Sequence, residues 1–172
     1  MTFNEESLLG FANELADEAS KITLKHFRST IHFEDKVDQS PVTQADRDVE
    51  ELLRAMIKKK YPSHGIIGEE YGSENEKAEF VWTLDPIDGT VSFINGVPLF
   101  TTLVGVIKQG LPFLGVIDQP VLKDRWSGSD KRIIYKSNVA KTRPCEGVEL
   151  ASLYTTAHEI FDQSESIKFK NL

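Results

Sequence analysis

The residues best suited to chemistry lie in residues 82–90, which read Trp-Thr-Leu-Asp-Pro-Ile-Asp-Gly-Thr. Asp85 and Asp88 stand three residues apart, directly after an apolar run. Pro86 fixes one backbone angle between them, and Gly89 permits a tight turn. Carboxylates are the oxygen ligands that Mg²⁺ prefers, with water and a substrate phosphate completing its coordination. The segment therefore predicts a magnesium site.

Gly89 and Thr90 also indicate a phosphate-binding turn. A turn that leads into a helix directs backbone N–H groups outward, where they bind anions, and Thr90 is suited to capping such a helix. Asp-Pro and Asp-Gly pairs also occur in ordinary turns. The complete string after an apolar strand favours the functional interpretation over a simple turn.

Two further acidic segments precede this one. Residues 68–70, Gly-Glu-Glu, follow a second short apolar run. Paired glutamates are usually a solvated surface, but beside Asp85 we interpret Glu69 as a metal ligand and water-orienting group. Thr43 and Asp46 stand at the start of a helical pattern, where capping by Thr43 with an acid in the first turn explains both residues without catalysis. Asp46 therefore keeps two interpretations.

Helical and extended segments must position these residues. Apolar residues at helical spacing predict one helix over residues 4–27 and a second over residues 43–60, closed by Pro62. Runs of apolar and β-branched residues predict the strands. These strands cover residues 80–84, 100–107, 111–117, 124–127, 132–136 and 150–155.

Composition limits the class of protein. The 172 residues suit one domain or most of one, and 40% hydrophobic with 27% charged residues is globular composition. A net charge of −7 argues against non-specific nucleic-acid binding, and no apolar run approaches the roughly 20 residues of a membrane helix. Cys145 is the single cysteine, so no intrachain disulfide forms. The first residues do not resemble a signal peptide, and we expect a cytoplasmic location.

The segments 43–46, 68–70 and 82–90, in this order, resemble the inositol monophosphatase-like family of magnesium-dependent sugar and polyol phosphatases. The resemblance implies an α/β (α+β) fold: a layered α/β sandwich with a largely antiparallel sheet, of the inositol monophosphatase/fructose bisphosphatase type. It also implies that residues 1–172 form the N-terminal metal- and phosphate-binding portion of that fold.

The resemblance further implies a set of metal ligands. Glu69, Asp85 and the backbone carbonyl of Ile87 would hold a first Mg²⁺. Asp85 and Asp88 would share in a second.

The same resemblance implies the catalytic and substrate contacts. Thr90 and Glu69 would orient the attacking water, and Asp46 would help position it. The substrate is expected to be a small phosphate ester. Its phosphate would lie against four consecutive residues: Ile87, Asp88, Gly89 and Thr90.

Finer similarity concerns the substrate. Residues 98–103, 115–126 and 142–145 resemble the histidinol-phosphatase branch, so histidinol phosphate is the expected substrate and inositol 1-phosphate the alternative. Family members carry a later Trp-Asp motif that completes the second metal site, and this sequence contains no Trp-Asp pair. We therefore expect a shortened chain, and a non-catalytic metal- and phosphate-binding module remains a second interpretation. Because relatives are commonly dimers, we expect a homodimer.

Overall fold

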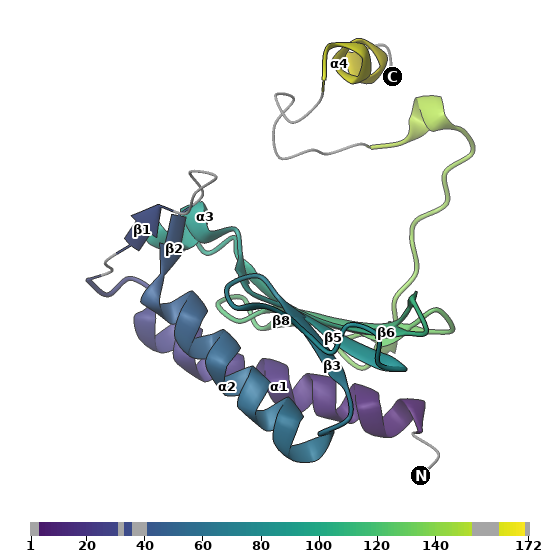
Figure 1. Cartoon of the computed structure of the whole chain (residues 1–172). Helices are drawn as coiled ribbons and strands as arrows, with labels where there is room; N and C mark the ends of the chain where they lie inside the picture. Colours follow the sequence, from purple (N-terminus) through teal and green to yellow (C-terminus); the bar gives the residue numbers. More distant parts are fainter. Residues whose placement is uncertain (1–3, 31–32, 36–40, 153–161, 171–172) are drawn as a thin grey trace. The chain divides into compact units, whose positions relative to one another are not determined.

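The computed structural model describes residues 4–30, 33–35, 41–152 and 162–170 (Figure 1). The chain divides into two units, residues 1–140 and 141–172. All of the segments that predict chemistry lie in the first unit, which is described first.

Two long helices open the first unit. The helix α1 (Glu5–His26) begins after Asn4, whose side chain accepts the backbone N–H of Glu6 at 3.2 Å. The helix α2 (Gln44–Lys60) begins after Thr43 and ends with three lysines, which suit the negative end of its dipole. The helices predicted over residues 4–27 and 43–60 are therefore confirmed.

A mostly antiparallel sheet follows the helices along the chain. Among the described residues it has eight strands in the order β10-β9-β8-β7-β6-β5-β3-β4, and only the pair of β3 and β5 is parallel. A small second sheet pairs β1 (Phe33–Asp35) with β2 (Pro41–Thr43), and the short helix α3 covers Thr90–Ile94. The strands of the large sheet are β3 (Gly65–Gly68), β4 (Gly72–Glu74), β5 (Phe80–Asp88), β6 (Thr101–Lys108), β7 (Leu111–Gln119), β8 (Asp124–Ser129), β9 (Ile133–Tyr135) and β10 (Asn138–Val139).

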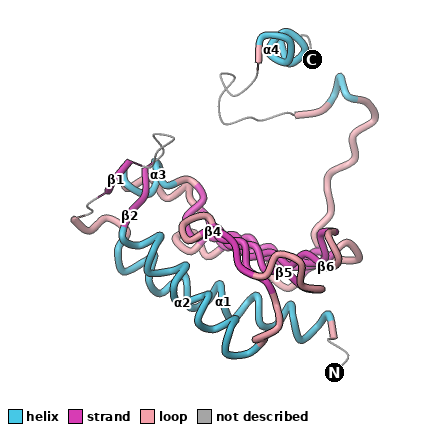
Figure 2. The backbone as a smooth tube through the Cα atoms, in the orientation of Figure 1, coloured by secondary structure: helices cyan, strands magenta, loops and turns pink. Residues whose placement is uncertain are grey.

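The helices α1 and α2 lie side by side against one face of this sheet (Figures 1 and 2). Side chains alternate between the two faces of a strand, and in β5 the buried Trp82 and Leu84 point to the helices. The ring of Trp82 packs edge-on against Phe11 of α1 at 5.5 Å, and its indole N–H donates to Nδ1 of His64 at 3.1 Å. The layered α/β fold with a largely antiparallel sheet is thus confirmed.

The opposite face of the sheet carries the next set of side chains. Strand pairing places Asp85, Leu103, Ile117 and Trp126 in one row across β5, β6, β7 and β8. The neighbouring row contains Gly105, Gly115 and Gly128, and these small residues leave a hollow of about 520 Å³ over the sheet. Asp85 therefore lies at the end of a row that faces away from α1 and α2.

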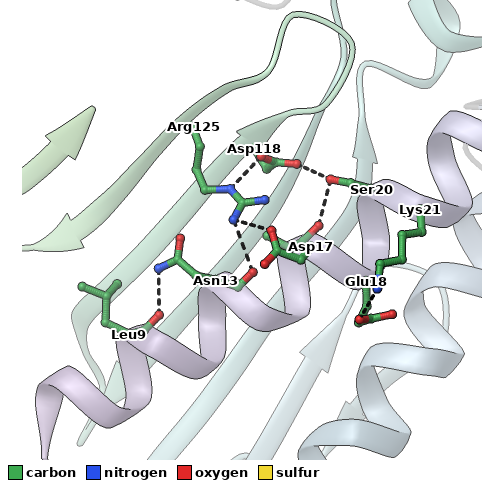
Figure 3. A network of polar contacts seen from close by, with 9 residues as sticks. Leu9, Asn13, Asp17, Glu18, Ser20, Lys21, Asp118 and Arg125 are labelled. Carbon is green, nitrogen blue, oxygen red and sulfur yellow. Dashed lines mark hydrogen bonds and ion pairs between the residues drawn. The ribbon is translucent and has the colours of Figure 1, made fainter. Parts of the chain in front are cut away.

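A polar network fixes α1 to the sheet (Figure 3). Asp118 of β7 is buried and accepts hydrogen bonds from the Ser20 hydroxyl and from Nε of Arg125, the latter at 2.7 Å. Arg125 of β8 also pairs with Asp17 of α1 at 2.7 Å and donates to the carbonyl of Asn13 at 3.4 Å. A buried charge that is paired on both sides in this way holds the helix in one position over the two strands.

The second unit contains a short 3₁₀ turn, η1 (Val148–Leu150), and a helix, α4 (Gln163–Lys170). The strand predicted over residues 150–155 is wrong for residues 150–152, and residues 153–155 lie outside the described residues. The backbone N–H of Leu150 donates to the nearby carbonyl of Gly147, and the Leu150 side chain is 64% exposed. Leu150 therefore does not pair with a neighbouring strand. The five other predicted strands agree with the structure to within four residues at each end. No described helix has the length and apolar character needed to span a membrane.

Candidate active site

The parallel pairing of β3 with β5 ends directly before two acidic residues and brings them together. Gly68 of β3 pairs with Leu84 of β5, so Glu69 and Asp85 both come directly after this last pair. The backbone N–H of Glu69 donates to the carbonyl of Leu84 at 3.2 Å, and the two carboxyl groups share a hydrogen bond. Parallel pairing thus joins residues from separate sequence segments.

The charge of Asp85 is poorly compensated by the protein. Burial, together with repulsion from the neighbouring Glu69, Asp88 and Asp46, raises the pKa of Asp85 to about 8. Its Oδ1 is buried and has no hydrogen-bond partner among the described residues. A cation would supply the interaction that this oxygen lacks, and an all-oxygen donor set matches the preference of Mg²⁺. The residues present therefore fit a magnesium ion.

A bulge separates Asp85 from Asp88 in β5. Asp85 pairs with Leu103 and Asp88 with Thr101, so β5 has one more residue than β6 between these pairs. Pro86 lies in this bulge and has no N–H for the ladder. Asp88 is exposed, and one of its carboxylate oxygens accepts the Thr101 hydroxyl at 3.3 Å. Because Leu103 and Thr101 lie on one face of β6, the extra residue keeps Asp88 on the same face as Asp85, where its charge acts on Asp85.

The turn after Asp88 takes a left-handed backbone. Gly89 has φ of +91°, and it is the N-cap of α3, so the expectation that Thr90 caps the helix is wrong. Thr90 is instead the first helical residue, and its hydroxyl donates to the Ile87 carbonyl at 3.0 Å. A carbonyl oxygen has a second lone pair, so Ile87 remains able to bind a metal.

Asp46 belongs to the start of α2. It is buried, and its Oδ2 accepts both the backbone N–H of Thr43, at 2.8 Å, and the Thr43 hydroxyl. The capping interpretation is confirmed. Because the charge of Asp46 also raises the pKa of Asp85, the cap lies beside the site, and the role of Asp46 in positioning the water stays a prediction.

The structure therefore gathers some of the predicted residues more closely than others. Glu69 and Asp85 contact each other, whereas Asp88 accepts a hydrogen bond from Thr101 and acts on Asp85 through its charge. Across the described ranges, no three His, Cys, Asp or Glu side chains already converge as a metal cluster. The site opens into a hollow of about 390 Å³ on the sheet face away from α1 and α2. The residues that line this hollow are Ile67, Gly68, Glu69, Thr83, Leu84, Asp85 and Leu103.

The sequence did not indicate Glu50 and Thr102, which contact the backbone of the acidic segments, or Arg54, which pairs with Glu50. Glu50 and Arg54 share the helix face of Leu53, because residues three and four apart lie on one side of a helix. A charged pair within an apolar stripe was the signal that could have identified them. The position of Thr102 depends on strand register, which the sequence does not specify.

Comparison with known proteins identifies the family to which this site and fold are similar. The sequence model described as the inositol monophosphatase family matches residues 4–172. A bifunctional phosphatase, IMPL2, of Arabidopsis thaliana chloroplasts is 45% identical over 88% of this chain and 44% of its own length. A histidinol-phosphatase of Mycobacterium tuberculosis is 38% identical over 69% of this chain and 46% of its own length. The chain thus spans less than half the length of these relatives.

Solved structures agree with the sequence comparison. An inositol monophosphatase from Zymomonas mobilis superposes with a TM-score of 0.83 at 37% identity, over 98% of this chain and 65% of that chain. An inositol monophosphatase from Thermotoga maritima gives a TM-score of 0.71 at 26% identity, over 77% of this chain and 52% of that chain. Fold, motif order and sequence similarity agree, and the chain belongs to the inositol monophosphatase family.

Proposed function

We propose that this chain carries the metal- and phosphate-binding part of a magnesium-dependent phosphatase that hydrolyses the phosphate monoester of a small alcohol. The observation that carries the proposal is the pair of Glu69 and Asp85, with a buried Asp85 oxygen that has no partner among the described residues. The phosphatase names of the relatives support the same reaction.

Each residue has a role in this proposal. Glu69, Asp85 and the Ile87 carbonyl hold one Mg²⁺, and Asp85 with Asp88 holds part of a second. When bound, Mg²⁺ makes water a stronger nucleophile near neutral pH and offsets the charge of the phosphate. No nucleophilic side chain is required, because phosphoryl transfer depends mainly on positioning and charge stabilisation.

The phosphate and the attacking water require further contacts. The N–H groups of Gly89 and Thr90 hold the phosphate, next to Ile87 and Asp88. The Thr90 hydroxyl and Glu69 orient the water for in-line attack, with Asp46 behind them. Because Thr90 also bonds the Ile87 carbonyl, its hydroxyl links the phosphate side of the site to the metal side.

Histidinol phosphate is the substrate that we propose first. Relatives named histidinol-phosphatase come from Mycobacterium tuberculosis and, at 44% identity over 66% of this chain, from Chlorobaculum parvum. Inositol 1-phosphate is the second candidate, because the Zymomonas mobilis structure at TM-score 0.83 is an inositol monophosphatase.

Phosphate release tests the reaction. The 172-residue chain is assayed on both substrates, with Mg²⁺ and with a chelator, beside Asp85→Asn and the exposed control Asp130→Asn. Magnesium-dependent release that Asp85→Asn abolishes and Asp130→Asn retains is the expected result. Release that persists in the chelator or in Asp85→Asn would refute the assignment.

The alternative function is a module that binds metal and phosphate without turnover. This alternative is supported by the coverage of the relatives, because the chain spans less than half of their length. Calorimetric titration with MgCl₂ separates the two functions. Magnesium binding that requires Asp85, without phosphate release from either substrate, would select the module. The homodimer and the cytoplasmic location stay predictions, and analytical ultracentrifugation tests the first.

A further inference from the structure

A buried carboxylate from α2 lies beneath the turn that carries Glu69. Glu50 is 0% exposed, yet it is in the middle of a helix that packs on the sheet. Its Oε2 accepts the backbone N–H of Glu70 at 2.7 Å, and its Oε1 accepts the N–H of Tyr71 at 3.1 Å. Both donors follow Glu69 directly in the chain, so Glu50 binds the turn through its backbone.

Arg54 completes this arrangement one helical turn later. It is 6% exposed, and its Nε donates to Oε1 of Glu50 at 2.7 Å. Its guanidinium also donates to the Gly72 carbonyl, and to Glu74 of β4 at 2.7 Å. We call Glu50 and Arg54 the turn clamp, because together they contact the turn from residue 70 to residue 74.

The residue that precedes Glu69 in the chain, Gly68, also lies close to the turn clamp. A Cβ atom added at Gly68 would lie 1.9 Å from Oε1 of Glu50 and 2.7 Å from Nη2 of Arg54. Only a glycine lets the last residue of β3 approach the carboxylate this closely. The backbone is therefore held against Glu50 on both sides of Glu69.

Stability alone does not explain a buried ion pair in this place. The desolvation cost of such a pair often exceeds its attraction, and apolar residues of similar volume frequently replace it without loss. Apolar residues cannot accept the N–H groups of Glu70 and Tyr71, however. The feature that depends on the charges is the path of the backbone next to Glu69.

We propose that Glu50 is a positioning residue that holds the Glu69 carboxylate beside Asp85 for metal binding. This inference rests on the proposed function. Glu50 acts through the peptide groups that follow Glu69, and the hydrogen bond from Nε of Arg54 orients the Glu50 carboxylate. Groups that orient a metal ligand in this way typically change metal affinity by about 10- to 100-fold when they are altered.

The first test is Glu50→Gln, which preserves shape but replaces one acceptor oxygen by a donor. Magnesium affinity of the 172-residue chain is measured by calorimetric titration, and the melting temperature is measured separately without metal. We expect about tenfold weaker binding in protein that remains folded. Glu51→Gln is the matched control, because Glu51 is the next residue of α2 and is exposed, and we expect it to bind like the wild type.

A double variant, Glu50→Met with Arg54→Met, removes the charges without leaving either one unpaired. It is expected to remain folded, since an apolar pair fills the same volume, and to melt somewhat lower than the wild type, because the Glu70 and Tyr71 N–H groups lose their acceptors. It is also expected to bind Mg²⁺ at least tenfold more weakly, because the turn loses its acceptors. A purely structural clamp would change the melting temperature and leave the affinity of folded protein unchanged.

The outcomes separate the two proposals. Wild-type affinity in both folded Glu50→Gln and the double variant would overturn the positioning role while leaving the proposed function intact. Failure of the wild-type chain to bind Mg²⁺ through Asp85 would overturn the proposed function and, with it, the role of Glu50. Weakened binding in the folded double variant, measured below its melting temperature, supports the positioning role, even if Glu50→Gln does not fold.

Discussion

The hydroxyl of Thr102 donates a hydrogen bond of 2.8 Å to the backbone carbonyl of Pro86, between the carboxylates of Asp85 and Asp88. Thr102 is fully buried in β6, and Pro86 lies in the bulge of β5. Because proline has no N–H to donate, this side-chain contact fixes a peptide that the strand ladder leaves partly unpaired. Strand β6 therefore determines where the two carboxylates point.

Replacement of Thr102 by Val tests this contact. The variant keeps the shape of the side chain and leaves the Pro86 carbonyl without its donor, so we expect a loss of about 1–3 kcal/mol in the free energy of unfolding. Urea denaturation measures it. Thr102→Ser keeps the hydroxyl and is expected to bind Mg²⁺ like the wild type, whereas Thr102→Val binds more weakly; equal affinities would contradict the anchoring role.

The raised pKa of Asp85 predicts a pH dependence of stability without metal. The folded protein keeps the Asp85 proton up to about pH 8, whereas the unfolded chain loses it near pH 3.8, the ordinary pKa of an aspartic acid. The folded state then binds more protons across this window, so the contribution of Asp85 to stability falls as pH rises from about 4 to about 8. Above pH 8 the loss is complete.

The comparison with Asp85→Asn isolates this contribution from other titrating groups. The amide carries no charge, so the melting temperature of Asp85→Asn, relative to that of the wild type in a chelator, should rise steadily between pH 4 and pH 8. A difference that stays constant across this range would show that Asp85 titrates normally in the folded chain.

Magnesium binding is expected to release a proton below about pH 8. Since the metal requires the ionised carboxylate, apparent affinity should increase up to tenfold per pH unit below pH 8 and level off above it. Titration calorimetry in two buffers of different ionisation enthalpy counts the protons released. Equal heats in both buffers at pH 6.5 would contradict this coupling.

Gly89→Ala tests the left-handed turn before α3. With φ of +91° and the Leu99 carbonyl oxygen 3.1 Å from the position of a Cβ, the alanine is expected to destabilise the protein by about 1–3 kcal/mol. Phosphate release should fall as well, because this turn presents the proposed phosphate-binding N–H groups. Thermal and urea denaturation measure the first effect.

Gly10→Ala is the matched control for that substitution. Gly10 is exposed within α1, and an added Cβ meets no atom within 4 Å. Alanine in a helix interior is favoured over glycine, so a gain of about 0.5–1 kcal/mol is expected. A loss at Gly10 as large as that at Gly89 would show that backbone conformation is not the reason for the effect.

Local signals predicted the helices well. Asn4 and Thr43 have side chains that satisfy the first N–H groups of a helix, and each lies directly before an apolar stripe, so both helix starts followed from the sequence. The contact between Glu69 and Asp85 could be predicted from the sequence only in part. Their residue types indicated a shared site, whereas their contact depends on β3 and β5 being parallel neighbours.

Other features depend on tertiary structure that the sequence pattern does not contain. Leu150 has strand-forming character but makes a local turn, because strand residues need a partner ladder. The turn clamp of Glu50 and Arg54 depends on the way that α2 crosses the end of β3. The direction of Asp88 depends on a one-residue bulge, which alters the side-chain alternation from which orientation is inferred.

The order of elements along the chain also has a consequence for biosynthesis. Asp46, Glu69, Asp85 and Asp88 all precede β6, and they emerge from the ribosome before it does. Until β6 pairs with β5, Thr102 cannot hold the Pro86 carbonyl, and the bulge lacks its anchor. Completion of β6 is therefore the step in synthesis at which a set of acidic residues first acquires the geometry of a binding site.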